Sequence, residues 1–257
     1  FINILADLAK KTSGEIEVLN INHENNLIEA KKLMGIVPQE LNIDPFFTPY
    51  ELLEIQAGLY GIRKKDRKTM EILEMLALED KAKAYARTLS GGMRRRLLIA
   101  KAMVHDPEIL ILDEPTAGVD VELRSNLWEN IHKLNQKGKT IIITTHYLHE
   151  AEELCNEIAI INEGKLIAHD TTINIKSFLD KMTVIVDYSD NNFDLSELNK
   201  LNLHIQIRDK QVQIDYKPSE VNFNVMLDAV NSSKSEIKDM KIKETKLEDV
   251  FLQLTQK

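Results

Sequence analysis

Two neighbouring carboxylates follow a short apolar run in the middle of the chain. Residues 109–112 (ILIL) lead directly into Asp113 and Glu114. Open α/β sheets place their ligand sites at the carboxyl ends of central strands. Because successive strand residues point to opposite faces, we expect one carboxylate to reach a Mg²⁺ ion while the other faces an attacking water. Phosphoryl transfer to water has these two requirements, although a strand that simply runs into an acidic turn would give the same pattern.

A serine and two glycines form a second candidate site. Ser90, Gly91 and Gly92 directly precede the helical pattern of residues 93–104. Glycines let backbone N–H groups approach an anion closely, and the positive end of a helix dipole adds to the attraction. An ordinary capped helix start would also explain them, because Ser is common there. For the arginine run at positions 94–96 we expect at least two side chains to lie on a solvated face.

Two other residue types with potential chemistry receive a plainer interpretation. His146 follows the strand pattern of residues 140–144, but a histidine in such a place is by itself more often packed or exposed than functional. His149 is expected to be exposed. Cys155 is the single cysteine; it lies in a helical pattern, and we expect it to pack as a small apolar residue in a reducing compartment.

The apolar runs predict an α/β domain with a parallel sheet. Residues 33–37, 109–112 and 140–144 have the composition of buried strands, and the helical pattern of residues 121–136 joins the last two. Apolar residues recur every three to four positions from Tyr50 to Ala77, broken at Gly61, which predicts a helical subdomain over about residues 45–104. Residues 157–161 and 165–169 flank a turn, which predicts a hairpin at the edge of the same sheet.

A second, smaller domain is expected beyond residue 179. The order of its patterns, β-α-β-β-α-β with a closing helix, predicts a ferredoxin-like α+β fold. We therefore assign residues 1–179 to the first domain and residues 180–257 to an accessory domain. The predicted strands are residues 183–188, 203–208, 211–216 and 236–243, and the predicted helices are residues 194–200, 219–232 and 246–255.

Composition limits the partners of the chain. Its 41 acidic residues outnumber its 33 basic ones, and the net charge of -8 disfavours nucleic acid as a partner. The sequence has no apolar run of the ~18 residues that a membrane span requires. We therefore expect any membrane association to come through a partner protein.

Five motifs together resemble the ABC ATPases, the family of P-loop NTPase-like domains that power membrane transporters. Residues 36–39, which end in Gln39, are similar to the glutamine loop of this family. The other four motifs, in the family's order, resemble its signature, Walker B motif, D-loop and switch histidine: LSGGM at 89–93, ILILDEP at 109–115, AGVD at 117–120 and ITTH at 143–146.

The resemblance implies roles for individual residues. Glu114 matches the general base that polarises water, and Asp113 matches the acid that holds Mg²⁺ through its water shell. Gln39 is expected to complete the shell of metal and water, and His146 to contact the γ-phosphate of ATP. Asp120 matches the D-loop acid that communicates between two subunits.

The family also implies a dimer. Ser90, Gly91 and Gly92 of one copy would contact the γ-phosphate of ATP bound to the other copy. We therefore expect two ATPase domains to close head to tail around two nucleotides.

One motif of the family does not occur in the sequence. None of the 257 residues form a G-x-x-x-x-G-K-[ST] loop, which supplies the N–H cradle and the lysine for the phosphates. Residues 1–10 resemble the helix that follows such a loop, and residues 12–18 the segment after that helix. We expect this chain alone to bind ATP weakly or not at all. A truncated or degenerate subunit that dimerises or regulates without hydrolysis is the alternative.

Within the family, the chain most resembles ATPase subunits of ABC-2-type exporters. The resemblance is carried by residues 89–120, the following TTHYLHEAEELC and the closing residues 247–254. It implies transmembrane permease subunits that dock near Gln39 and residues 45–75, at the cytoplasmic face of the inner or plasma membrane. DNA-repair members have long coiled-coil insertions and translation members usually have two cassettes; neither feature is present.

Overall fold

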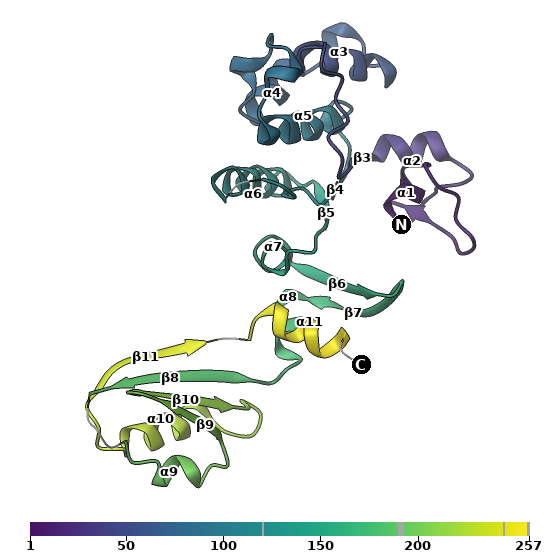
Figure 1. Ribbon diagram of the computed structural model, residues 1–257. Coiled ribbons are helices and arrows are strands. Elements are labelled where there is room, and N and C mark those ends of the chain that lie inside the picture. The colour runs from purple at the N-terminus through teal and green to yellow at the C-terminus, as the bar shows by residue number, and fades with distance from the viewer. Residues whose placement is uncertain (120, 190–192, 244, 256–257) are drawn as a thin grey trace. The chain divides into compact units, whose positions relative to one another are not determined.

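The computed structural model describes residues 1–119, 121–189, 193–243 and 245–255 (Figure 1). The chain divides into two compact units, Phe1–Tyr147 and Leu148–Lys257. The predicted domain boundary after residue 179 lies inside the second unit, because the preceding hairpin packs with the C-terminal helix.

The first unit combines a short parallel sheet with a group of helices. Its elements in chain order are α1 (Ile2–Leu5), β1 (Glu17–Val18), β2 (Ile21–Asn22), α2 (Leu27–Leu33), β3 (Met34–Val37), α3 (Pro49–Leu59), the 3₁₀ turn η1 (Lys64–Asp66), α4 (Thr69–Met75), η2 (Glu79–Lys81), η3 (Ala86–Thr88), α5 (Gly91–Met103), β4 (Ile109–Asp113), α6 (Val121–Gln136) and β5 (Thr140–Thr144).

Strand β4 is the centre of the sheet β3-β4-β5, and both of its neighbours run parallel to it. Its residues Leu110, Ile111 and Leu112 are buried, as expected for a strand covered on both faces. The predicted parallel β-α-β arrangement is therefore confirmed. It places the ends of all three strands at one edge of the sheet, which is the edge that carries the candidate residues.

Strand β3 packs unusually closely against helix α5 at Gly35. A Cβ atom at this position would lie against the carbonyl oxygen of Ala102, closer than real contacts allow, and 3.0 Å from side-chain atoms of Pro107 and Leu110. Glycine permits this approach because it has no side chain. The contact ties the helix that begins at Ser90 to the strand that ends just before Pro38.

The helical pattern predicted from Tyr50 to Ala77 is confirmed as α3, η1 and α4. Helix α3 begins with a reciprocal cap between Thr48 and Glu51, each side chain bonding the other residue's backbone N–H. The predicted break at Gly61 is also confirmed, because this residue has a φ of 75° just after α3 ends. Leu53, Leu73, Leu76 and Leu78 are fully buried in this region.

Two predictions for the N-terminal region are wrong. The helix expected over residues 1–10 is a single turn, α1, and the chain leaves the helical conformation at Asp7, which has a φ of 61°. The alternating residues 15–20 (EIEVLN) predict a short strand as well, but this strand is broken at Leu19 and Asn20, which adopt φ values of 48° and 67°. A tight antiparallel hairpin, β1-β2, forms there instead.

The second unit contains a two-stranded hairpin, a four-stranded sheet and short helices. Its elements are α7 (Leu148–Leu154), β6 (Glu157–Asn162), β7 (Lys165–Thr171), α8 (Thr172–Ser177), β8 (Met182–Tyr188), α9 (Ser196–Asn199), β9 (His204–Arg208), β10 (Gln211–Tyr216), α10 (Phe223–Asn231), β11 (Ile237–Lys243) and α11 (Leu247–Thr255).

The four-stranded sheet has the predicted ferredoxin-like topology. Its strand order is β11-β8-β10-β9, and every neighbouring pair is antiparallel. Counted from β8, this is the order 4-1-3-2 that a β-α-β-β-α-β chain produces. Helices α9 and α10 lie on one side of the sheet (Figure 1), where α10 buries Met226 and Val230 in the core.

The hairpin β6-β7 was predicted at the edge of the parallel sheet, and this prediction is wrong. It forms a separate two-stranded sheet. The buried Ile158 and Ile160 of β6 pack with Ile175 of α8 and with Leu247 and Val250 of α11. The hairpin therefore buries its apolar face within the second unit, and Cys155 packs partly buried against the same cluster, as predicted for an apolar role.

Candidate functional site

The pair Asp113 and Glu114 lies where β4 ends. Strand β4 stops at Asp113, and Glu114 takes a backbone φ of 48°. The prediction that the two side chains alternate across a continuing strand is therefore wrong, because the chain turns sharply between them. This conformation costs a non-glycine residue about 1 kcal/mol or more, and it persists only where the surroundings hold the residue in place.

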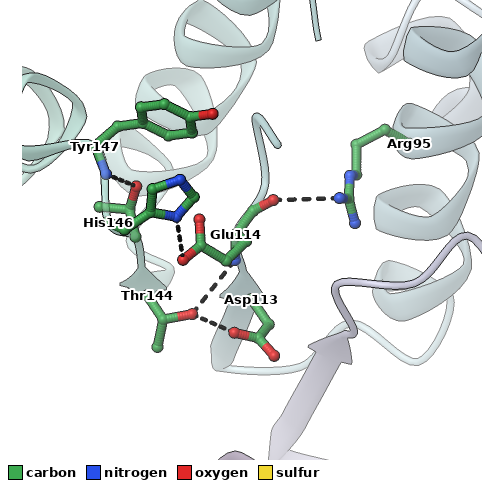
Figure 2. Close-up of polar contacts among 7 residues, drawn as sticks. Arg95, Asp113, Glu114, Thr144, His146 and Tyr147 are labelled. Atoms are coloured by element: carbon green, nitrogen blue, oxygen red, sulfur yellow. Dashed lines mark hydrogen bonds and ion pairs between the residues drawn. The ribbon is translucent and has the colours of Figure 1, made fainter. Parts of the chain in front are cut away.

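Thr144, at the end of the neighbouring strand β5, holds both residues (Figure 2). Its carbonyl oxygen accepts the backbone N–H of Glu114 at 3.0 Å. Its hydroxyl oxygen, which Figure 2 shows, lies 3.3 Å from the same backbone nitrogen, and the hydroxyl group donates to the Asp113 carboxylate. The register of the parallel strands, which pairs Asp113 with Thr144, creates these contacts. One threonine thus fixes the backbone of one acid and the side chain of the other.

His146 meets the carboxylate of Glu114. Its Nδ1 atom lies 2.8 Å from Oε1 of Glu114, and the histidine side chain is 62% exposed whereas the glutamate side chain is 17% exposed. The other oxygen, Oε2 of Glu114, is buried and has no hydrogen-bond partner among the described residues. Glu114 therefore presents one occupied and one unoccupied acceptor.

The aromatic ring of Tyr147 packs against the imidazole of His146. The Tyr147 ring lies with its centroid 4.1 Å from that of His146, tilted by 36°, and the Arg124 guanidinium sits 5.1 Å from the centre of the Tyr147 ring. Arg124 also donates to the carbonyl oxygen of Val119 at 3.5 Å. These contacts connect the segment after β5 to the start of α6.

Arg95 reaches the same region from helix α5. It is 3% exposed, and its two terminal nitrogens donate to the carbonyl oxygen of Pro38, at 2.8 Å, and to that of Glu114, at 3.2 Å. Figure 2 shows the contact with Glu114. Arg96 donates to the carbonyl oxygens of Leu76 and Ala77. The prediction that at least two of the three arginines are merely solvated is therefore wrong. A run of charges in a sequence does not reveal which backbone carbonyls lie opposite it.

The signature residues begin helix α5. Ser90 is its N-cap, and the serine side chain accepts the backbone N–H of Met93 at 3.3 Å. Both Ser90 and Gly91 are exposed, so the first turn of a 13-residue helix is open to a ligand. The structure shows a capped helix start, and binding of an anion there stays a prediction.

Two further residues predicted from the sequence, Gln39 and Asp120, remain to be located. Gln39 is exposed and follows Pro38, whose carbonyl oxygen Arg95 holds. Asp120 lies outside the described residues. Among the residues missed from the sequence, Thr144 could have been found, because two threonines precede His146 and the parallel register brings the first to Asp113. No signal in the sequence distinguishes Arg95 from its neighbours.

Comparison with known proteins identifies the family. A family model described as ABC transporter matches residues 1–117. The linearmycin resistance ATP-binding protein LnrL of Bacillus subtilis (strain 168) is 33% identical over 99% of this chain and 84% of that protein. The chain belongs to the ABC transporter ATP-binding family. ATP hydrolysis is the activity of this family, and its α/β, P-loop NTPase-like fold is the fold of the first unit.

Two further ABC proteins show how far the likeness extends. The Nod factor export ATP-binding protein I of Burkholderia orbicola is 40% identical over 65% of this chain. The matched region spans 56% of the length of the Nod factor export protein. The structure of the ATP-binding cassette MJ0796, a dimer bound to ADP and phosphate, superposes with a TM-score of 0.57 at 26% identity. The superposed region covers 66% of this chain and 78% of the MJ0796 chain.

Proposed function

We propose that this chain is the ATP-hydrolysing subunit of an ABC-2-type exporter. The observation that carries the proposal is the geometry of Glu114, with one carboxylate oxygen on His146 and the other buried and unpaired. An acceptor that is buried but free of protein partners suits a water molecule that must be held and deprotonated. Family membership supplies the substrate class, ATP.

Glu114 would act as the general base. Its backbone is fixed at both ends, by Thr144 at the N–H and by Arg95 and Ala117 at the carbonyl oxygen. The side chain therefore starts from a defined position, with His146 restricting its rotation. In this proposal Oε2 accepts the proton of the attacking water, and His146 contacts the transferred phosphoryl group from the exposed side.

Asp113 fits the requirements of Mg²⁺ coordination. Carboxylate oxygens are the ligands this ion prefers, and it usually keeps several waters and takes further ligands from phosphates. The described residues contain no group of three or more His, Cys, Asp or Glu side chains that could hold a metal ion by itself. When bound, Mg²⁺ would neutralise phosphate charge. Asp113 would hold its water shell and Gln39 would complete it.

A second copy of the domain completes the proposed site. Ser90, Gly91 and Gly92 at the start of α5 would contact the γ-phosphate of ATP on the partner copy, and Asp120 would lie at the same interface. The support is the exposed and capped N-terminus of α5, together with the dimeric assembly of the related cassette MJ0796. Head-to-tail closure around two nucleotides follows from these roles.

Export would be performed through transmembrane permease subunits. No helix in the described ranges is long and apolar enough to cross a membrane. The relatives are named for linearmycin resistance and for Nod factor export. The region of residues 45–75 exposes large apolar side chains, among them Phe46, Tyr50 and Leu59, which would suit a docked partner at the cytoplasmic face of the membrane.

Substitution of Glu114 by Gln tests the proposal. Glutamine keeps the size of the side chain but cannot accept the proton, so phosphate release by the product of the complete gene should fall ~100-fold or more. Binding of ATP, measured separately, should persist. Glu108→Gln is the matched control, because it changes an exposed carboxylate at the opposite end of β4. Unchanged turnover in Glu114→Gln would remove the general base from the proposal.

A second candidate function is a subunit that dimerises or regulates without hydrolysis. It is favoured by one observation, since the 257 residues contain no G-x-x-x-x-G-K-[ST] loop. We therefore expect these residues alone to bind Mg-ATP with a Kd no tighter than ~1 mM, about -4 kcal/mol. Isothermal titration with a phosphate-release assay measures this. Micromolar binding with turnover would contradict the expectation, and would show that other residues supply the phosphate cradle.

A further inference from the structure

Arg95 joins two segments that the proposed chemistry requires. Its guanidinium group bridges the carbonyl oxygen of Pro38, the residue before Gln39, and the carbonyl oxygen of Glu114. These residues are distant in sequence, and Arg95 itself belongs to α5, the helix that starts at Ser90. A single buried side chain thus contacts the start of the glutamine loop and the proposed base from the signature helix.

Burying the charged guanidinium group of Arg95 costs free energy. Burial lowers the pKa of Arg95, whereas the charges of Asp113 and then of Glu114 act in the opposite direction. A charge that is 3% exposed is retained only where specific hydrogen bonds and neighbouring charges compensate its desolvation. Guanidinium suits this position because its planar donors can hold two carbonyl oxygens at once, which an ammonium on a shorter stem does less well.

We propose that Arg95 is a positioning residue that sets the backbone of Glu114 and the distance of Gln39 from it. This inference rests on the function proposed above. Arg95 touches no reacting atom in the proposal; it acts through the two carbonyl groups. Movement of α5 on nucleotide binding would therefore be passed directly to the proposed base.

The strained conformation of Glu114 explains why such a residue matters. A φ of 48° persists only where the surroundings determine it. The N–H of Glu114 is held by Thr144, and its carbonyl oxygen accepts Arg95 at 3.2 Å and the N–H of Ala117 at 3.1 Å. Without Arg95, the carbonyl oxygen of Glu114 keeps only the hydrogen bond from the Ala117 N–H. The peptide can then relax, and the side chain moves relative to His146.

Arg96 provides a matched control at the adjacent position. Its guanidinium also donates to two carbonyl oxygens, those of Leu76 and Ala77, but these belong to the end of α4 and the residue after it. Arg95→Lys and Arg96→Lys therefore remove the same kind of two-carbonyl contact from the same helix. Only the first should affect Glu114.

Amide hydrogen exchange on the 257-residue chain tests the role without any nucleotide. We expect the Glu114 amide to exchange at least ~10-fold faster in Arg95→Lys than in wild type, beyond any change in global stability. The carbonyl ¹³C shifts of Pro38 and Glu114 should move as well. Arg95→Met, which removes all donors, should give a larger effect. If the Arg95→Met protein does not fold, the exchange rate measured in Arg95→Lys alone tests the role of Arg95.

Either of two results would overturn the inference. One is a folded Arg95→Lys protein with unchanged exchange at Glu114. The other is an equal change in Arg96→Lys, which would mean that both arginines only stabilise the fold.

Phosphate release by the product of the complete gene gives an independent readout. Arg95→Lys should lower kcat ~10-fold while the KM for ATP changes less than ~2-fold, because a displaced base affects the chemical step more than binding. A wild-type protein without hydrolysis would refute the proposed function. The exchange result would still decide the role of Arg95.

Discussion

The imidazole of His105 is tied at one nitrogen and unpaired at the other. Nε2 lies 3.1 Å from the carbonyl oxygen of Met34, so Nε2 carries the proton, and Nδ1 is buried with no partner among the described residues. The ring stacks on Tyr60 with centroids 3.8 Å apart and an interplanar angle of 3°. Protonation at Nδ1 would place a charge where no acceptor is available, which is costly.

Acid should therefore destabilise the first unit through His105. Burial lowers the pKa of His105, and nearby Lys139 lowers it further, against opposing contributions from the Met34 carbonyl and Asp106. The unfolded chain thus binds the proton first, near pH 6.5, and stability is lost as pH falls below that value, by at most ~1.4 kcal/mol per pH unit. Urea unfolding followed by the single tryptophan, Trp128 in the first unit, measures this at pH 7.5 and 5.5.

Two substitutions separate His105 from other acid-sensitive groups. His105→Gln keeps a donor for Met34 but does not titrate, so the fall in stability between the two pH values should become smaller. His132→Gln, at an exposed position of α6, should leave it unchanged. An identical pH dependence in wild type and His105→Gln would contradict this account.

At this scale the sequence indicated which side chains would lie together where residue type and spacing coincide. Asp113, Glu114 and His146 were singled out because an apolar strand before two acids and a strand before a histidine are local patterns. The structure brings the three residues together, and their catalytic roles stay predictions. The contact of Arg95 with Pro38 and Glu114 could not be predicted, since it depends on the approach of α5 to two distant segments. The positive φ of Glu114 was missed because strand patterns do not show where the strand ends.

The packing of α5 on β3 depends on the absence of one side chain. Gly35 allows the Ala102 carbonyl oxygen to approach more closely than a Cβ atom would permit. Helix α5 carries both Ser90 and Arg95, so this contact helps to set where both residues lie relative to the sheet. Helix α5 is therefore positioned by a close backbone contact with β3 rather than by interlocking side chains.

Gly35→Ala should push α5 away from β3. Overpacking of this kind typically costs 1–3 kcal/mol, and we expect a loss of unfolding free energy of about 2 kcal/mol in the first unit. Urea unfolding followed by Trp128 fluorescence measures the change. Gly58→Ala is the control, because its Cβ would meet only the end of the Arg67 side chain at 3.4 Å and alanine favours the helix. Equal stability of Gly35→Ala and wild type would mean that the helix can shift at no cost.

Elements were predicted well where apolar residues form a clear run or recur at a regular spacing. The strands β3, β4 and β5 and the helices α3, α5 and α6 follow from runs of apolar residues at the proper spacing. The hairpin β6-β7 was recognised, but its neighbours were not, because alternating residues indicate a buried face without identifying what covers it. The N-terminal helix was overestimated, since nothing in the sequence marks the left-handed turn at Asp7.

At the scale of the whole molecule, each unit has a core of its own. In the second unit the sheet core is formed by Val184, Val186, Ile214 and Met226 with their neighbours, and the hairpin core by residues of β6, α8 and α11. All members of both clusters lie within residues 148–257. The apolar contacts of both clusters are therefore internal to the second unit.

Residues 148–257 should fold when produced alone. We expect a far-UV circular dichroism spectrum of mixed helix and strand and a cooperative urea transition. Ile214→Ala, which empties a fully buried position, should lower the free energy of unfolding by 2–5 kcal/mol if the native core has formed. A fragment without a cooperative transition, or one indifferent to this substitution, would show that the second unit depends on the first.

Helix α11 is the last described element of the chain, yet the surface it covers is built from much earlier residues. Ile158, Ile160 and Ile175 leave the ribosome before strands β8 to β11, and Leu247 and Val250 follow those strands. The four-stranded sheet can therefore form during synthesis while the hairpin still lacks its cover. A pause in translation just after β11 would prolong the exposure of these isoleucines and make the nascent chain a substrate for chaperones.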